Sequence, residues 1–288
     1  MKSYFRGLCL MFSASLCSAA SADADESIDH GDGYALYWTI GETPVRDGDF
    51  WVREQESIVE TRLWPVGLYT SDKPVNGADG AVLVPAGAQF VRVTGDRLLV
   101  CTQARTTTGL SKSKRVCLAD MDGDGTIDAS FAKGLGGTSW IVFSGKFSES
   151  KAQPISGVTL RELSPQEMNE APYVSFHYQR ILDGGLQFPL TQEGGNMVRF
   201  HFRVGKTEKD YRTWVVRECR EPGQPSFCAS ASFPSHMTIA GLDLELLERR
   251  KEDIRMRMIQ PFRGQRVRFV DTSYGYYTQL SLFSPENP

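Results

Sequence analysis

Hydrophobic and polar residues alternate along much of this chain with the period of a β-strand. The alternation is clearest over 198–204 and 254–259, where apolar side chains take one face and Arg or His the other. Further short runs rich in Val, Ile, Phe, Tyr and Thr stand between clusters of Gly, Pro, Asn and Asp. The predicted strands are 34–40, 81–84, 89–93, 97–103, 140–147, 197–204, 213–217 and 265–270. The pattern predicts an all-β protein with antiparallel, sandwich-like sheets.

The segment 242–258 is the main ambiguity in this reading. It is rich in residues that favour helices, yet its apolar positions alternate on both sides of a central Arg-Lys-Glu-Asp run. We predict a β-hairpin here, and a single helix is the competing interpretation.

The first 22 residues carry the features of a secretory signal peptide. Lys2 and Arg6 precede a short apolar stretch at 7–15, and Ala-Ser-Ala at 20–22 forms a small-x-small cleavage pattern. The apolar stretch is too short to span a bilayer. We therefore expect residues 1–22 to be removed, and the mature chain to be periplasmic or secreted with no transmembrane segment.

Six cysteines occur in the chain, and two of them fall in the signal segment. The remaining even number in an oxidising compartment favours disulfides. Cys101 and Cys117 lie across one plausible hairpin, and Cys219 and Cys228 lie across another. We predict these two local disulfides, and the two other pairings stay open. A zinc site is less well supported, because the sequence holds no Cys-x-x-Cys motif and no cluster of His.

The charge of the chain is small overall but unevenly distributed. Across 288 residues, 32 Lys and Arg stand against 35 Asp and Glu, a formal net charge of -3, which argues against a nucleic-acid binder built on bulk charge. Residues 23–150 hold 12 basic and 19 acidic side chains, whereas 151–288 hold 18 and 16. We expect two β modules, an acidic one at 23–150 and one with basic strand faces at 151–288. A single large sandwich fits these lengths as well.

The strongest local motif is the nine-residue run DMDGDGTID at 120–128. Carboxylates at its positions 1, 3, 5 and 9, with Gly at position 6, suit a hard cation that prefers oxygen ligands. We predict a structural calcium site. Its ligands are Asp120, Asp122, Asp124, Thr126 through the backbone carbonyl, and Asp128 directly or through water.

This run resembles two known types of calcium loop. Up to position 9 it is similar to an EF-hand loop, but position 12 is Phe131 instead of a bidentate Glu, and its flanks do not look helical. It also resembles the β-hairpin calcium loops of integrin-type FG-GAP repeats. Because the sequence holds one such loop, the resemblance implies the loop type and not a propeller. The alternative is an Asp- and Gly-rich turn without metal, although its four carboxylates would then repel one another.

No catalytic motif stands out, and we assign no catalytic residue. The sequence holds neither a GxSxG elbow nor an HExxH helix. Several basic residues on alternating strands could align into a stripe suited to an acidic polysaccharide, or could simply face water. They are Arg199, His201, Arg203, Arg255, Arg257, Arg266 and Arg268. We expect a binding or structural role at the cell envelope, with an anionic polysaccharide or another envelope component as partner and no nucleic acid. The alternative is a secreted lyase or hydrolase that acts on an acidic polysaccharide.

Overall fold

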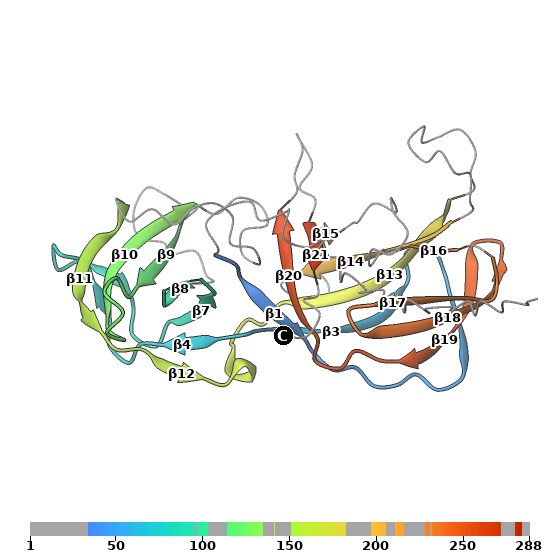
Figure 1. Cartoon of the computed structure of the whole chain (residues 1–288), viewed down its shortest axis with the longest axis horizontal. Coiled ribbons are helices and arrows are strands. Elements are labelled where there is room, and N and C mark those ends of the chain that lie inside the picture. The colour runs from blue at the N-terminus through green and yellow to red at the C-terminus, as the bar shows by residue number, and fades with distance from the viewer. Residues whose placement is uncertain are drawn as a thin grey trace, which may run out of the picture. The chain divides into compact units, whose positions relative to one another are not determined.

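The computed structural model is all-β, as predicted, and nearly all of its strand pairs are antiparallel (Figure 1). It describes residues 34–95, 97–102, 114–134, 141, 151–182, 197–205, 211–215, 228–230, 232–271 and 280–283. All of these belong to one compact unit, Gly31–Pro288. The predicted signal segment and the predicted disulfide partner Cys219 lie outside the described residues. Within the described ranges, no helix is long and apolar enough to cross a membrane.

The largest sheet has eight strands, and its first strand, β13, also pairs with β14, the second strand from the other end. In order across the sheet, the strands are β13 (Tyr173–Leu182), β3 (Ser57–Pro65), β1 (Tyr37–Ile40), β20 (Arg266–Asp271), β21 (Leu280–Phe283), β15 (Tyr211–Val215), β14 (Met197–Gly205) and β16 (Cys228–Ser230).

A second sheet has seven strands and carries the motif at 120–128. Its order is β11 (Gln153–Val158), β10 (Ile127–Gly134), β9 (Lys114–Ala119), β8 (Leu99–Thr102), β7 (Gln89–Val93), β4 (Leu68–Thr70) and β12 (Arg161–Leu163). A two-stranded ladder joins β5 (Val75–Asn76) to β6 (Val82–Val84), and a short 3₁₀ helix spans Pro165–Glu167.

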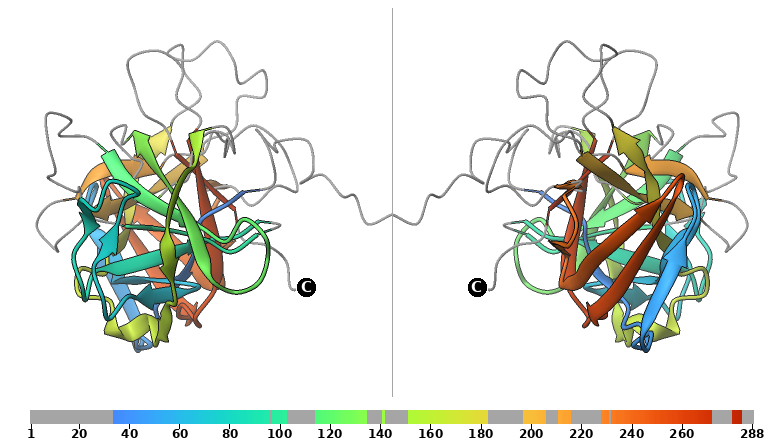
Figure 2. Two further views of the ribbon diagram at one scale, coloured as in Figure 1. Left: turned by 90° about the vertical axis from the view of Figure 1, so that its left-hand side faces the viewer. Right: turned by 90° about the vertical axis from the view of Figure 1, so that its right-hand side faces the viewer.

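A third sheet has four strands, ordered β17 (Ser235–Ile239), β18 (Leu242–Arg250), β19 (Asp253–Gln260) and β2 (Asp49–Val52). Figure 2 shows β2 from the beginning of the chain beside β19 from near its end. Each of the three larger sheets combines strands from both sides of residue 150. The two halves of the chain therefore do not form separate sheets.

The hairpin prediction for 242–258 is confirmed. Strands β18 and β19 pair antiparallel, with Leu246 opposite Met256 and with Lys251 in the tight turn at a φ of 55°. The alternating apolar residues of both strands are buried, so the alternation outweighed the helix propensity of the segment. They are Leu242, Leu244, Leu246, Ile254, Met256 and Met258.

Strand β9 is buried on both faces, which matters for the sites described below. Cys117 and Ala119 belong to the main apolar core, which also contains Trp38 and residues of the four-stranded sheet. Val116 and Leu118 belong to a second cluster on the opposite face of β9. The strand is thus packed on both sides within its sheet.

Candidate metal centre

The motif at 120–128 forms the loop of the β9–β10 hairpin. Ala119 pairs with Ala129 at the base of the loop, and the Asp120 amide donates a hydrogen bond of 3.0 Å to the Leu98 carbonyl oxygen. Ile127, at the other end of the loop, is completely buried. Both ends of the loop are therefore anchored in packed structure.

Three of the predicted ligands come together in this loop. One carboxylate oxygen from each of Asp120, Asp122 and Asp124 lies within 4.8 Å of the other two. Asp120 is buried, with 4% of its surface exposed, while Asp122 and Asp124 are exposed. Such a group of oxygen donors can hold a metal ion.

Backbone amides of the loop fix the directions of these carboxylates. The two oxygens of Asp120 accept hydrogen bonds from the amides of Gly123, at 2.7 Å, and Gly125, at 2.9 Å. Both glycines have a positive φ, 80° and 88°, which turns their N–H groups toward the start of the loop. The amide of Thr126 donates to Asp124 Oδ1 at 2.6 Å. The carboxylates are consequently ordered before any ion binds.

Asp128 lies outside the three-residue group. Its Oδ1 accepts a hydrogen bond of 3.1 Å from the Met121 amide, and the Met121 carbonyl accepts another from Arg97 Nη1 at 3.1 Å. Asp128 therefore ties the start of the loop to β10. Its role as a metal ligand, and that of the Thr126 carbonyl, stay predictions.

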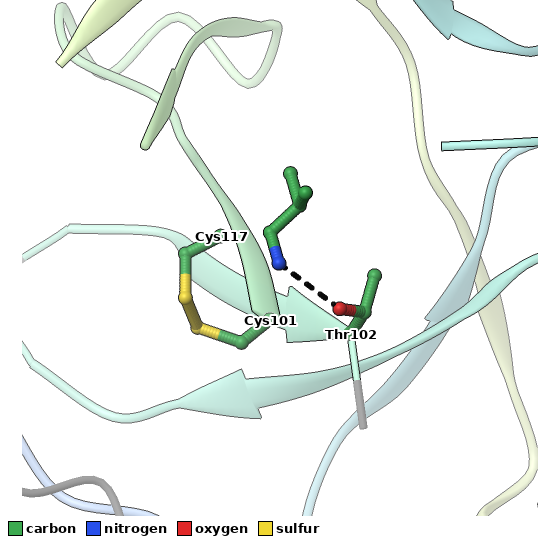
Figure 3. The surroundings of a disulfide bond; sticks show 4 residues. Cys101, Thr102 and Cys117 are labelled. Carbon is green, nitrogen blue, oxygen red and sulfur yellow. Dashed lines mark hydrogen bonds between the residues drawn. A yellow bond between two sulfur atoms is a disulfide. The ribbon is translucent and has the colours of Figure 1, made fainter. Parts of the chain in front are cut away.

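One of the two predicted disulfides is present beside this loop (Figure 3). The sulfur atoms of Cys101 and Cys117 lie 2.04 Å apart, and the two residues are direct partners in the β8–β9 ladder. One residue further on, Thr102 Oγ1 accepts a hydrogen bond from the Val116 amide at 3.1 Å. For the other predicted pair, the structure describes only the backbone of Cys228, in β16.

Arg115, near the start of β9, is a buried charge that sequence reasoning missed. Only 1% of its surface is exposed, and among the described residues none of its three guanidinium nitrogens has a hydrogen-bond partner. Burial lowers its pKa to about 10, so the guanidinium stays protonated at neutral pH. An unpaired buried ion costs several kcal/mol. The one signal in the sequence is its position two residues before Cys117, which places both side chains on the same face.

A second polar cluster lies across strands β13 and β14. The rings of His177 and His201, which are register partners, stack with centroids 5.3 Å apart. Ser175 Oγ lies 2.6 Å from His177 Nε2, and Arg203 Nε donates to His201 Nε2 at 3.0 Å. The Gln55 carbonyl lies 3.1 Å from His177 Nδ1. These contacts restrict both rings to one arrangement.

Both histidines are neutral at physiological pH. Burial, with the backbone hydrogen bond of Gln55 opposing it, lowers the pKa of His177 to about 4. Burial and then the neighbouring charges of His177 and Arg203 lower the pKa of His201 to about 3. The imidazole rings of the cluster are therefore buried and uncharged.

The predicted basic stripe is not assembled on one surface. Its members on β14 and on β20 are separated in the sheet order by β21 and β15, and those on β19 lie in a different sheet. There, Arg257 contacts Asp49 at 2.8 Å and Glu245 at 3.3 Å, and Arg255 contacts Glu248 at 3.6 Å. The arginines of β19 are thus neutralised by their neighbours.

Comparisons with known proteins add no assignment. The chain matches no family model, no curated protein and no solved structure. A function can therefore be inferred only from the geometry described above.

Proposed function

We propose that the loop at 120–128 binds a structural calcium ion in an exported β protein. The observation that carries the proposal is the convergence of oxygens from Asp120, Asp122 and Asp124 within 4.8 Å. Carboxylate ligands in a short, irregular loop suit Ca²⁺, which accepts six to eight oxygens in variable geometry. Mg²⁺ demands near-ideal octahedral geometry and keeps more of its water, so it fits such a loop less well.

The bound ion would stabilise the loop by neutralising crowded carboxylates. Asp120 and Asp124 already accept hydrogen bonds from backbone amides, which reduces the ordering cost of binding. The loop follows directly from β9, whose two faces pack into two apolar clusters. Ion binding at one end of this strand therefore adds to the stability of the whole hairpin.

The wider role that we propose is binding or structural support at the cell envelope. Its support is the signal-like segment 1–22, the cysteine pair at disulfide distance and the absence of a recognisable catalytic motif in the sequence. An anionic polysaccharide is the partner to test first. Retention of the intact polysaccharide by the purified protein would support the binding role, whereas shortening of its chains would identify a lyase or hydrolase.

Calcium titration of the mature protein tests the metal site. An extracellular-type site is expected to bind with a Kd of about 10⁻⁴–10⁻³ M. At 10 mM calcium such a Kd stabilises the fold by about 1.4–2.7 kcal/mol, which raises Tm by several degrees. Asp122→Asn should abolish this rise. Magnesium at the same concentration should produce a smaller one.

Asp79→Asn is the matched control for that titration. Asp79 is also an exposed turn aspartate, and its Oδ1 accepts a hydrogen bond from the Ala81 amide at 3.0 Å, but it lies outside the three-carboxylate group. Its replacement should leave the response to calcium intact. The proposal fails if calcium produces neither heat nor a change in Tm, or if Asp79→Asn and Asp122→Asn reduce the response equally.

A further inference from the structure

Arg115 lies at the end of β9 opposite to the aspartate loop. Asp120 is five positions further along the chain, roughly 17 Å along an extended strand. Its neighbours Cys117 and Ala119 on the same strand face belong to the main apolar core. Its guanidinium is buried as well, yet among the described residues it makes no hydrogen bond.

The sequence on both sides of Arg115 holds no nearby acid that could pair with it. No Asp or Glu occurs between Asp96 and Asp120, a segment that contains β8, β9 and their connection. None occurs between Asp128 and Glu149 either, which covers the rest of β10. The register partner of Arg115 on β10 is another cation, Lys133. The described residues of this strand end are therefore positively charged, and Arg115 has no hydrogen-bond partner among them.

We propose that Arg115 is the anchor of a binding site for an oxyanion, a carboxylate, phosphate or sulfate group of a ligand. A guanidinium presents its N–H donors in a planar fork that matches two oxygens of such a group. Pairing with the anion supplies both the hydrogen bonds and the counter-charge that the described residues lack. Because only 1% of Arg115 is exposed, the anion reaches it only when neighbouring side chains move.

Arg115 lies beside backbone that is fixed by a hydrogen bond and a disulfide, which favours a specific binding site over nonspecific attraction of anions. Val116 follows Arg115 directly, and its amide donates a hydrogen bond to Thr102 Oγ1 (Figure 3). This bond lies where the regular β8–β9 ladder ends. The disulfide between Cys101 and Cys117 fixes the two strands one step further along. The backbone that carries Arg115 is therefore held in place before a ligand binds. The lowered pKa of Arg115 agrees with a desolvated site but leaves the group charged.

The experiment measures Tm in sodium phosphate, sulfate and acetate against chloride at equal ionic strength. We expect at least one oxyanion to raise the Tm of the mature protein in a saturable way. A response to acetate alone identifies a carboxylate ligand, and a response to phosphate or sulfate identifies a tetrahedral oxyanion. Arg115→Met should abolish the response. In chloride its Tm should equal or exceed that of the unaltered protein, because an unpaired buried charge is removed.

Arg92→Met is the matched control, since Arg92 is an exposed arginine on β7 of the same sheet. It should leave the oxyanion response unchanged. A readout that does not depend on stability is the ¹⁵Nε–H NMR signal of Arg115, which should shift with the active anion. The proposal is overturned if no oxyanion changes Tm, or if Arg115→Met lowers Tm in chloride as a core truncation does. Because Asp122→Asn leaves Arg115 intact, the oxyanion response should survive the loss of the calcium response, so the two proposals fail separately.

Discussion

The hairpins β9–β10 and β18–β19 are both antiparallel, but they distribute charge in opposite ways. In β18–β19, Arg257 lies opposite Glu245 and Arg255 lies near Glu248, so cations and anions alternate across the ladder. In β9–β10 the signs are separated along the strand. Aspartates gather in the loop at one end. Arg115, which has no hydrogen-bond partner among the described residues, is buried near the other.

This difference bears on where we expect ligands to bind. Exposed ion pairs across a sheet satisfy one another and need nothing else. Three carboxylates converge in the loop, and the guanidinium of Arg115 has no hydrogen-bond partner among the described residues, so an ion of opposite sign would stabilise each. The β9–β10 hairpin is therefore the region in which we expect both a cation and an anion to bind.

The largest expected effect in this comparison comes from the covalent link of β9. Replacing Cys101 and Cys117 together by Ala should lower the free energy of unfolding by about 3 kcal/mol, because the link closes a loop of about 15 residues. Urea unfolding measures the loss. The β18–β19 hairpin contains no cysteine, so the double substitution does not change it directly.

Reducing agent provides the control for this prediction. It should destabilise the unaltered protein by a similar amount and have little further effect on the double variant. An equal loss in the double variant would show that the stabilisation comes from other cysteines.

A smaller effect on stability is expected from pH, because the fold buries two histidines in their neutral form. The pKa values of His177 and His201 lie near 4 and 3 in the folded chain, below the ordinary 6.5. Between the folded pKa values and 6.5, the unfolded chain binds more protons than the folded chain. The contribution of the two histidines to the free energy of unfolding is therefore fully present above pH 6.5 and is lost as pH falls toward 4. Arg115, in contrast, does not lose its proton on burial, since its pKa of about 10 keeps it charged at neutral pH.

We expect Tm to fall by roughly 4 °C or more between pH 7 and pH 5. The double variant His177→Gln/His201→Gln should flatten this dependence, whatever its absolute stability. His236→Gln serves as the control, because His236 is largely exposed and lies 3.7 Å from Asp243. An unchanged slope in the double variant would contradict the assignment to the buried pair.

The elements that sequence reasoning predicted well are those decided by local spacing. The alternation in 242–258 predicted the β18–β19 hairpin because every second residue had to face the core. The convergence of three aspartates follows from spacing within a single turn of chain. In both cases the partners are close in sequence, so no knowledge of strand order was needed.

Predictions that depended on strand order could not be made in the same way. The basic stripe required β14, β19 and β20 to be neighbours, whereas β14 and β20 are separated by two strands and β19 lies in another sheet. The burial of Arg115 likewise depends on the packing of both faces of β9. Local alternation placed it with Cys117 but could not show that this face is covered.

The smallest effect is expected from the ion pairs of β18–β19, and it is the sharpest test of the comparison. Arg257 is exposed, its pKa is raised by its hydrogen bond with Asp49, and it contacts Glu245 as well. Exposed pairs of this kind contribute little, so Arg257→Met should change Tm by about 1 °C or less, and 0.5 M NaCl should remove the difference.

The same substitution at Arg115 removes a buried charge that has no hydrogen-bond partner among the described residues, and it should raise Tm in chloride or leave it unchanged. If Arg257→Met instead lowers Tm as much as loss of the disulfide does, then cross-strand pairing stabilises this sheet strongly. The difference in charge arrangement would then not explain why β9–β10, and not β18–β19, is expected to bind ions.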